Sequence, residues 1–257
     1  MRLSLVVAGK EIKDHLRETR SLTSSALLAL MGPAVVLLVS MSDRASGKEK
    51  AAVLLGMLSV FALVSSFAGA TDIAMDATAG ERERRSLLPL LLNPVPRSVL
   101  ITGKWLAVTA FALAALALNC LATLAVLLWA APAAVASRAP LIVIWIGLGL
   151  VPLASLGAAL SIFVAIRCRT TKEAHTALRF VTFMPMVVGM FLVFFPAWAG
   201  TLWFLLPVVG QQVLIGLPEA AIPVERAALL AAVTLTAAVA VLVAATRVLS
   251  RDEILSV

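Results

Sequence analysis

Charged residues are scarce in this chain. Only 14% of the 257 residues are charged, and 61% are hydrophobic. Because ordinary globular domains carry about 25% charged residues, this composition excludes a typical soluble fold. The apolar residues come in long runs, which predict a polytopic membrane protein. The formal charge of +7 comes from cations at the ends of apolar segments, which indicates membrane topology and not a nucleic-acid partner.

Cysteine and histidine are nearly absent, with two residues of each. Cys120 falls within an apolar run and Cys168 at the polar end of another, so we expect them at different membrane depths and not joined by a disulfide. His15 and His175 have no second ligand at metal-binding spacing. We therefore predict no metal site on this chain.

Nucleotide-binding and nucleophile motifs are also missing. The Gly-Lys pairs that begin at Gly9, Gly47 and Gly103 lack the earlier glycine and the following Ser or Thr of a phosphate-binding loop. Two classes of membrane protein require motifs or symmetry of their own. An intramembrane protease would need paired histidines or a Gly-x-Ser-x-Gly motif, and an ATP-independent secondary transporter would usually show an internal repeat. The sequence shows none of these features, but it does not by itself exclude either class.

Six apolar segments are long enough to cross a bilayer, which needs about 20 residues. They cover residues 22–41, 51–70, 99–131, 141–166, 180–198 and 227–246. We therefore predict an all-α, polytopic integral membrane protein with six transmembrane helices, forming one transmembrane domain over residues 1–257.

Two further segments are apolar without being long, unbroken spans. In residues 1–21, Leu5, Ile12 and Leu16 recur at helical spacing opposite a charged face, which predicts a retained amphipathic helix in the membrane interface and not a signal peptide. Residues 200–224 are interrupted by Pro and Gly, so we expect a short re-entrant or interfacial hairpin before the last span.

The lysines and arginines are divided unevenly between the two sides of the membrane. With the amino terminus in the cytoplasm, five of the 21 lie outside, namely Arg44, Lys48, Lys50, Arg138 and Arg226. The other 16 lie inside, as the positive-inside rule requires. We predict a multi-pass protein of the cell inner (plasma) membrane with both termini in the cytoplasm.

One polar interruption has internal order. It runs from Gly80 to Lys104 and reads GERERRSLLPLLLNPVPRSVLITGK. Its marked positions are Gly80-Glu81-Arg82-Glu83-Arg84, Ser86-Leu87, Leu91-Leu92, Pro94, Arg97 and Gly103-Lys104. This pattern resembles the signature of the type 2 ABC exporter permeases, a group that includes the sodium-efflux permease and related six-span subunits. Two positions depart from it, because Arg85 stands where a glycine is usual and Leu88-Pro89 where an acid and a helix former are common.

The resemblance implies a permease that works with a separate ABC ATPase subunit. It implies a dimer of permease chains, as a homodimer or with a close relative, above two ATPase copies that hold ATP and Mg. This chain would then carry no catalytic residue and no cofactor. Residues 77–98 and 167–179 would be cytoplasmic coupling segments. Their ATPase-contacting residues would be Glu81, Arg82, Glu83, Arg84, Arg85, Arg169, Lys172 and Glu173.

The alternating charges of Glu81 to Arg85 support the same interpretation physically. Such a surface can form charge-assisted hydrogen bonds with a partner, and a rigid link into two spans can transmit the partner's motion. The alternative is that this charge run only marks the membrane surface and sets topology.

Few polar residues fall within or near the spans. Asp72 and Asp76 are four apart and share a helix face, so they could mark an ion or substrate path or simply lie at the inner membrane surface. Asn119 fits a helix-to-helix hydrogen bond better than a substrate ligand. Gln211 and Gln212 could line an exit. The substrate class, whether cation, lipid-like molecule, drug or peptide, does not follow from these residues.

Overall fold

The computed structural model of the chain describes residues 2–17, 19–41, 47–86, 95–130, 146–195, 203–216 and 222–249. Within these ranges every regular element is helical. The elements are α1 (Arg2–His15), α2 (Thr19–Ser40), α3 (Gly47–Met75), the π-helical turn η1 (Asp76–Gly80), α4 (Glu81–Glu83), α6 (Arg97–Ala130), the π-helical turn η2 (Ile146–Leu150), α8 (Val151–Ala165), α9 (Thr171–Phe194), the 3₁₀ turn η4 (Trp203–Leu205), α10 (Val209–Gly216) and α11 (Val224–Leu249). The predicted all-α class is confirmed.

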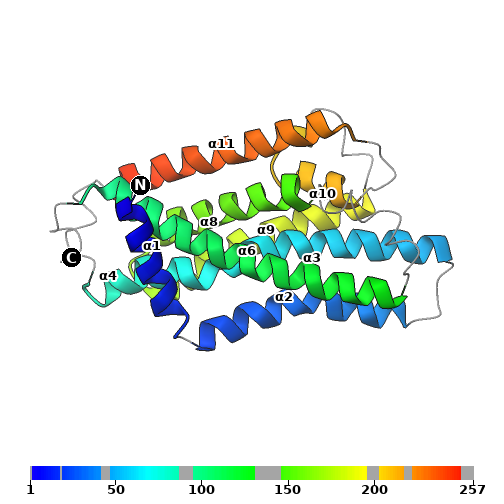
Figure 1. Ribbon diagram of the computed structural model, residues 1–257, viewed down its shortest axis with the longest axis horizontal. Coiled ribbons are helices and arrows are strands. Elements are labelled where there is room, and N and C mark those ends of the chain that lie inside the picture. The colour runs from blue at the N-terminus through cyan, green and yellow to red at the C-terminus, as the bar shows by residue number, and fades with distance from the viewer. Residues whose placement is uncertain are drawn as a thin grey trace.

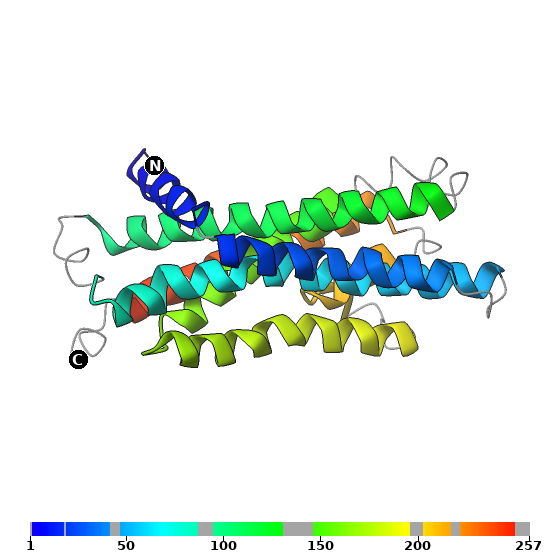
Figure 2. The same cartoon turned by 90° about the horizontal axis from the view of Figure 1, so that it is seen from below.

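The long helices lie roughly side by side in one elongated bundle, with α1 lying across one end of it (Figures 1 and 2). That end also holds η1 and α4, and we call it the α4 end. Arg97, the first residue of α6, donates a hydrogen bond of 3.3 Å to the carbonyl of Leu249 at the end of α11. The starts and ends of several long helices therefore meet at the α4 end.

Five stretches of the described chain are long and apolar enough to cross a membrane, at Ser59–Glu83, Arg97–Val126, Gly147–Ala165, Thr171–Phe194 and Val224–Leu249. They correspond to the second to sixth predicted spans. The first predicted span corresponds to α2, whose apolar part, Thr23–Leu38, is shorter. The chain is thus a polytopic membrane protein with five candidate spans among the described residues. The first predicted span, at α2, stays a prediction.

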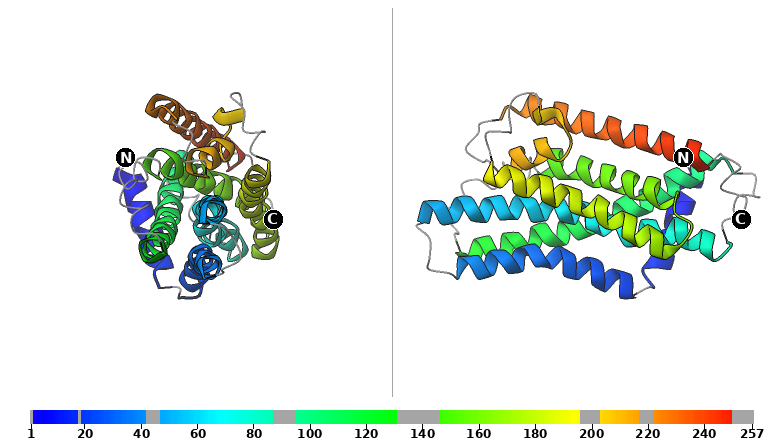
Figure 3. Two further views of the ribbon diagram at one scale, coloured as in Figure 1. Left: turned by 90° about the vertical axis from the view of Figure 1, so that its right-hand side faces the viewer. Right: turned by 180° about the vertical axis from the view of Figure 1, so that it is seen from behind.

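Helix α8 lies at the centre of the bundle, packed against α3, α6, α9 and α11 (Figure 3). Of its 15 residues, 11 are buried. Small residues allow close contact there, since a Cβ added to Gly157 would lie 3.2 Å from the carbonyl oxygen of Ser66 on α3. Leu63, Val108, Leu153 and Ile162 fill the core between these helices.

Some predicted boundaries were wrong. The fifth span was placed at residues 180–198, but α9 begins at Thr171, so most of the predicted polar segment 167–179 is the first part of that helix. The fourth span was placed at residues 141–166, and its described part consists of η2 and α8, with Pro152 in the first turn of α8.

Other predicted features lie outside the described residues in whole or in part. They are the loops at 42–50 and 132–140, residues 87–94 of the first coupling segment, residues 217–221 of the predicted hairpin and most of the tail at 247–257. The described part of the hairpin contains η4 and α10. Because α10 has eight residues, it spans about 12 Å and cannot cross a bilayer alone.

Candidate functional site

The segment from Asp76 to Ser86 forms the centre of the α4 end. After α3, the chain makes the π-helical turn η1 and then the short helix α4. Contacts from successive residues of α4 reach different parts of the bundle. The two predicted coupling segments also meet here, because residues 81–83 contact residues 166–171.

Glu81 faces the inside of the molecule. Its Oε1 lies 2.8 Å from Nζ of Lys104 on α6, and the same Nζ lies 3.1 Å from Oε1 of Glu11 on α1 and 2.7 Å from the carbonyl oxygen of Ala77. The Lys104 side chain is only 3% exposed. Three acceptors match the three donors of its ammonium group, as a buried charge requires. Lys104 therefore joins α1, η1 and α4 to α6.

Arg82 holds the end of α8. Its guanidinium donates to the carbonyl oxygens of Ile166, at 2.7 Å, and Cys168, at 2.9 Å. The last carbonyls of a helix have no partner within the helix, and they carry partial negative charge, so an arginine stabilises them well. Burial raises the pKa of the neighbouring Cys168 thiol, so this cysteine stays protonated near neutral pH.

Glu83 and Glu173 satisfy the backbone at the start of α9. Glu83 Oε2 accepts hydrogen bonds from the N–H of Thr171, at 2.9 Å, and from its hydroxyl, at 2.7 Å. The Thr170 hydroxyl caps the helix by accepting from the N–H of Glu173, and the Glu173 carboxylate accepts from the N–H of Arg169. Both acids therefore stabilise free N–H groups of a helix N-terminus.

The end of α4 is a Schellman motif. The N–H of Ser86 bonds to the carbonyl of Glu81, and the N–H of Arg85 bonds to that of Arg82. Arg85 has a positive φ of 56° at the position where this motif favours glycine. A glycine is usual at this position in the exporter permeases that the segment resembles. The positive φ explains this preference, because glycine adopts it without strain.

The residues Glu81, Arg82, Glu83 and Arg84 are thus engaged within the chain, Arg84 through Asp76 and the carbonyl oxygen of Gly80. We call them, together with Lys104 and Glu11, the brace. In contrast, the side chains of Arg85, Arg169 and Lys172 are exposed and form no hydrogen bond or ion pair with any residue that the structure describes. The exposed groups without a partner at this end are therefore cations. Contact of these residues with an ATPase stays a prediction.

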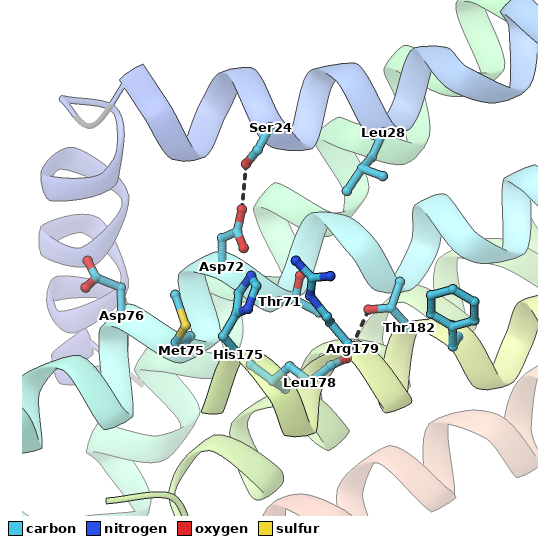
Figure 4. Close-up of a pocket in the computed structure, with 11 residues that line it drawn as sticks. Ser24, Leu28, Thr71, Asp72, Met75, Asp76, His175, Leu178, Arg179 and Thr182 are labelled. Atoms are coloured by element: carbon cyan, nitrogen blue, oxygen red, sulfur yellow. Dashed lines mark hydrogen bonds between the residues drawn. The ribbon is translucent and has the colours of Figure 1, made fainter. Parts of the chain in front are cut away.

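A cavity of about 640 Å³ lies beside the brace, between α2, α3, η1 and α9 (Figure 4). Asp72 and Asp76, the two predicted path residues near the inner membrane surface, both line it, as do His175 and Arg179 on α9. The hydroxyl of Ser24 on α2 donates a hydrogen bond of 2.6 Å to Oδ2 of Asp72. The shared helix face predicted for the two acids therefore borders an open space.

The other predicted path residues lie elsewhere and are engaged with neighbours. Asn119 on α6 donates to the carbonyl of Ala29 on α2 at 2.7 Å, which is a helix-to-helix bond. Gln211 donates to the hydroxyl of Thr234 on α11, and Gln212 donates to that of Ser59 on α3. All three are buried, with at most 3% of their surface exposed. None of them lines the cavity.

Sequence reasoning missed the buried face of α1. Ser4, Ala8, Glu11 and His15 are buried against the bundle, whereas the apolar Leu5 and Leu16 are exposed. The signal was present, because these four residues recur at helical spacing. It was hidden because a charged and polar face is normally the solvent face, and nothing near Glu11 in the sequence indicates Lys104, which comes 93 residues later.

Comparisons with known proteins identify the family of the chain. Residues 5–253 match the family described as ABC-2 family transporter protein. Over 194 residues the chain is 31% identical to a protein named ABC transporter permease protein NatB from Bacillus subtilis (strain 168). That alignment covers 66% of this chain and 47% of NatB, so the chain spans about half the length of this relative. With a helical bundle of candidate membrane spans and a family match over almost its full length, the chain belongs to the ABC-2 transporter family.

Proposed function

We propose that this chain is the membrane-spanning permease subunit of an ATP-driven exporter, and that a separate ABC ATPase subunit docks at the α4 end. The observation that carries the proposal is the brace. Glu81, Arg82 and Glu83 connect α4 to α6, to the end of α8 and to the start of α9. A displacement of α4 by a docked partner would therefore move several spans together.

The charge of the α4 end suggests which side chains meet the ATPase. Glu81 and Glu83 have partners within the chain, so they are poorly placed to be the main contacts. Arg85, Arg169 and Lys172 are exposed and form no ion pair within 4.0 Å among the described residues. An acidic groove on the ATPase would complement them, because opposite potentials guide and orient docking.

The proposed assembly contains two permease chains, as a homodimer or with a close relative, and two ATPase copies that hold ATP and Mg. The α4 end would face the cytoplasm, which agrees with the cation asymmetry of the sequence. Helix α2 would be a further span, the first of six in chain order. The exposed Leu5 and Val6 of α1, and Leu16 directly after it, would lie in the membrane interface, while the polar face of α1 stays on the bundle. Transport would occur by alternating access.

A charge-reversal pair tests the docking surface. Arg169→Glu with Lys172→Glu places repulsion against an acidic groove, so we expect capture of the ATPase subunit to fall at least about tenfold. The matched control is Lys13→Glu with Arg17→Glu, which makes the same charge change at exposed positions of the same end. The measurement is co-purification with candidate ABC ATPase subunits of the same genome, followed by ATP hydrolysis in nanodiscs.

Two results would contradict the proposal. One is that the unaltered chain captures no ATPase subunit under conditions where it is folded. The other is that the docking variant captures as much ATPase as the control variant, which would move the contact surface away from residues 169 and 172.

A further inference from the structure

The cavity beside the brace contains two opposite charges that do not meet each other. Asp72 extends from α3 toward α2, where its partner is the Ser24 hydroxyl, and Arg179 extends from α9 toward α3 (Figure 4). Within the described part of the chain, Asp72 has no cation within 4.0 Å, and Arg179 forms no hydrogen bond or ion pair. Asp76, the other carboxylate of the cavity, is already paired with Arg84.

This arrangement selects against simple ions. A cation at Asp72 would leave Arg179 unmatched and would be repelled by it, while an anion at Arg179 would face the Asp72 carboxylate. A ligand that carries both a cationic and an anionic group satisfies both side chains at once. The cavity is large enough for such a ligand, because 640 Å³ lies within the usual range of about 300–1,000 Å³ for small-molecule sites.

The remaining lining is apolar and continues onto the outer surface of the bundle. Leu28 of α2 and Leu178 and Phe183 of α9 line the cavity. Leu28 and Phe183 are also exposed, as is Phe180 beside Arg179. In a membrane these exposed faces meet acyl chains, so an amphiphile could keep its tail in the bilayer while its headgroup enters between α2 and α9.

The depth of the charges agrees with a headgroup. Arg179 lies eight residues after Thr171, the first residue of α9, which corresponds to about 12 Å along the helix. Basic residues in pockets between membrane helices bind the phosphate groups of lipid headgroups, and Arg179 is such a residue in this cavity. A soluble ligand would not require the exposed apolar border.

We propose that the cavity binds the zwitterionic headgroup of a phospholipid with a primary amine, with the phosphate at Arg179 and the ammonium group at Asp72. This inference names the substrate class of the exporter and rests on the proposed function. A primary ammonium group can donate hydrogen bonds to the Asp72 carboxylate, whereas a quaternary one cannot.

The test measures lipid binding to the purified full chain, without ATPase or nucleotide, by native mass spectrometry. The probes are phosphatidylethanolamine, phosphatidylcholine, the anionic phosphatidylglycerol and the soluble glycerophosphoethanolamine. We expect phosphatidylethanolamine to bind best and Arg179→Gln to weaken it about tenfold, through loss of a charge-assisted hydrogen bond. The matched controls are Arg226→Gln and Glu225→Gln, which lie at exposed positions on α11 and should change nothing.

Asp72→Asn distinguishes a change at the site from misfolding, because the two lipids should respond in opposite directions. It should weaken phosphatidylethanolamine binding and at the same time strengthen phosphatidylglycerol binding, because a repulsive carboxylate has been removed. Equal binding of all lipids by the unaltered chain, or a parallel loss of both lipids in Asp72→Asn, would overturn the proposal. Equally tight binding of glycerophosphoethanolamine would overturn the assignment to a lipid. If lipid binds as expected but no ATPase is captured, the exporter assignment fails and the site stands.

Discussion

At the α4 end, the buried Lys104 lies between the carboxylates of Glu11 and Glu81, whereas in the middle of the bundle α3, α6 and α8 meet through small and apolar residues. The first region depends on charge and hydrogen-bond geometry, and the second on close packing. Removing one charge from the brace leaves others unpaired, while a packed interface is sensitive to added volume. Polar contacts therefore hold the helices together where a partner is proposed to dock, and close packing holds them together in the membrane-spanning part of the bundle.

The largest expected effect is that of Lys104→Met. It leaves Glu81 without a cation and Glu11 with only the exposed Lys10, 3.8 Å away, so we expect a loss of about 3–5 kcal/mol in the free energy of unfolding, as for other broken buried ion pairs. Thermal unfolding in detergent measures it. Combining Lys104→Met with Glu11→Gln and Glu81→Gln removes the charges and should restore much of the stability. If Lys104→Met alone unfolds like the unaltered chain, the brace does not stabilise the α4 end.

A smaller effect is expected from Gly69→Ala in the packed region. An added Cβ would lie 2.6 Å from the Cβ of Ala115 and 3.1 Å from the backbone of α6, so α3 and α6 must move apart. Overpacking of this kind costs about 1–3 kcal/mol. Gly147→Ala is the matched control, because nothing lies within 4 Å of its added Cβ. Equal unfolding temperatures for the two variants would show that the middle of the bundle is more loosely packed than the structure indicates.

The smallest expected effect is a gain. Arg85→Gly should stabilise the end of α4 by about 1 kcal/mol, because a left-handed conformation strains any residue with a Cβ. Arg85→Ala is the control, since it removes the charge but keeps the Cβ, and it should give no such gain. Hydrogen exchange of residues 81–86 reports the change locally. Faster exchange in the glycine variant would contradict the expectation.

The sequence predicted the helical class and the positions of most spans, because hydropathy is a local property. It placed the start of α9 about nine residues too late, since Lys172, Glu173 and Arg179 are too polar for a hydrocarbon core, although a helix can continue beyond the membrane. The resemblance drew attention to residues 81–85, which form α4 and its C-terminal end, and their role as a coupling segment stays a prediction. It did not indicate that Glu81 faces inward, because that contact depends on Lys104 and on the fold of the intervening chain.

The lining of the cavity could also be predicted only in part, because it depends on residues that are distant in the sequence. The spacing of Asp72 and Asp76 predicted that they share a helix face, and both line the cavity. Arg179 was read as the end of a cytoplasmic segment, because its distance from Asp72 in the sequence hides the contact between α3 and α9. Gln211 and Gln212 were considered as possible exit residues because they are polar in an apolar stretch. Their bonds to Thr234 and Ser59 hold α10 in the bundle.

The π-helical turn η1 has a consequence for how this chain can change. Each residue of an α-helix advances the direction of the next side chain by about 100°, so the face of α3 would normally dictate the face of α4. A π turn accommodates an extra residue and thereby breaks this phase relation. The faces of α3 and α4 are therefore offset from each other, and this offset sets the directions in which Arg82 and Glu83 reach α8 and α9. In the proposed exporter, this turn would separate the membrane-spanning part of the helix from the part that lies beside the ATPase subunit.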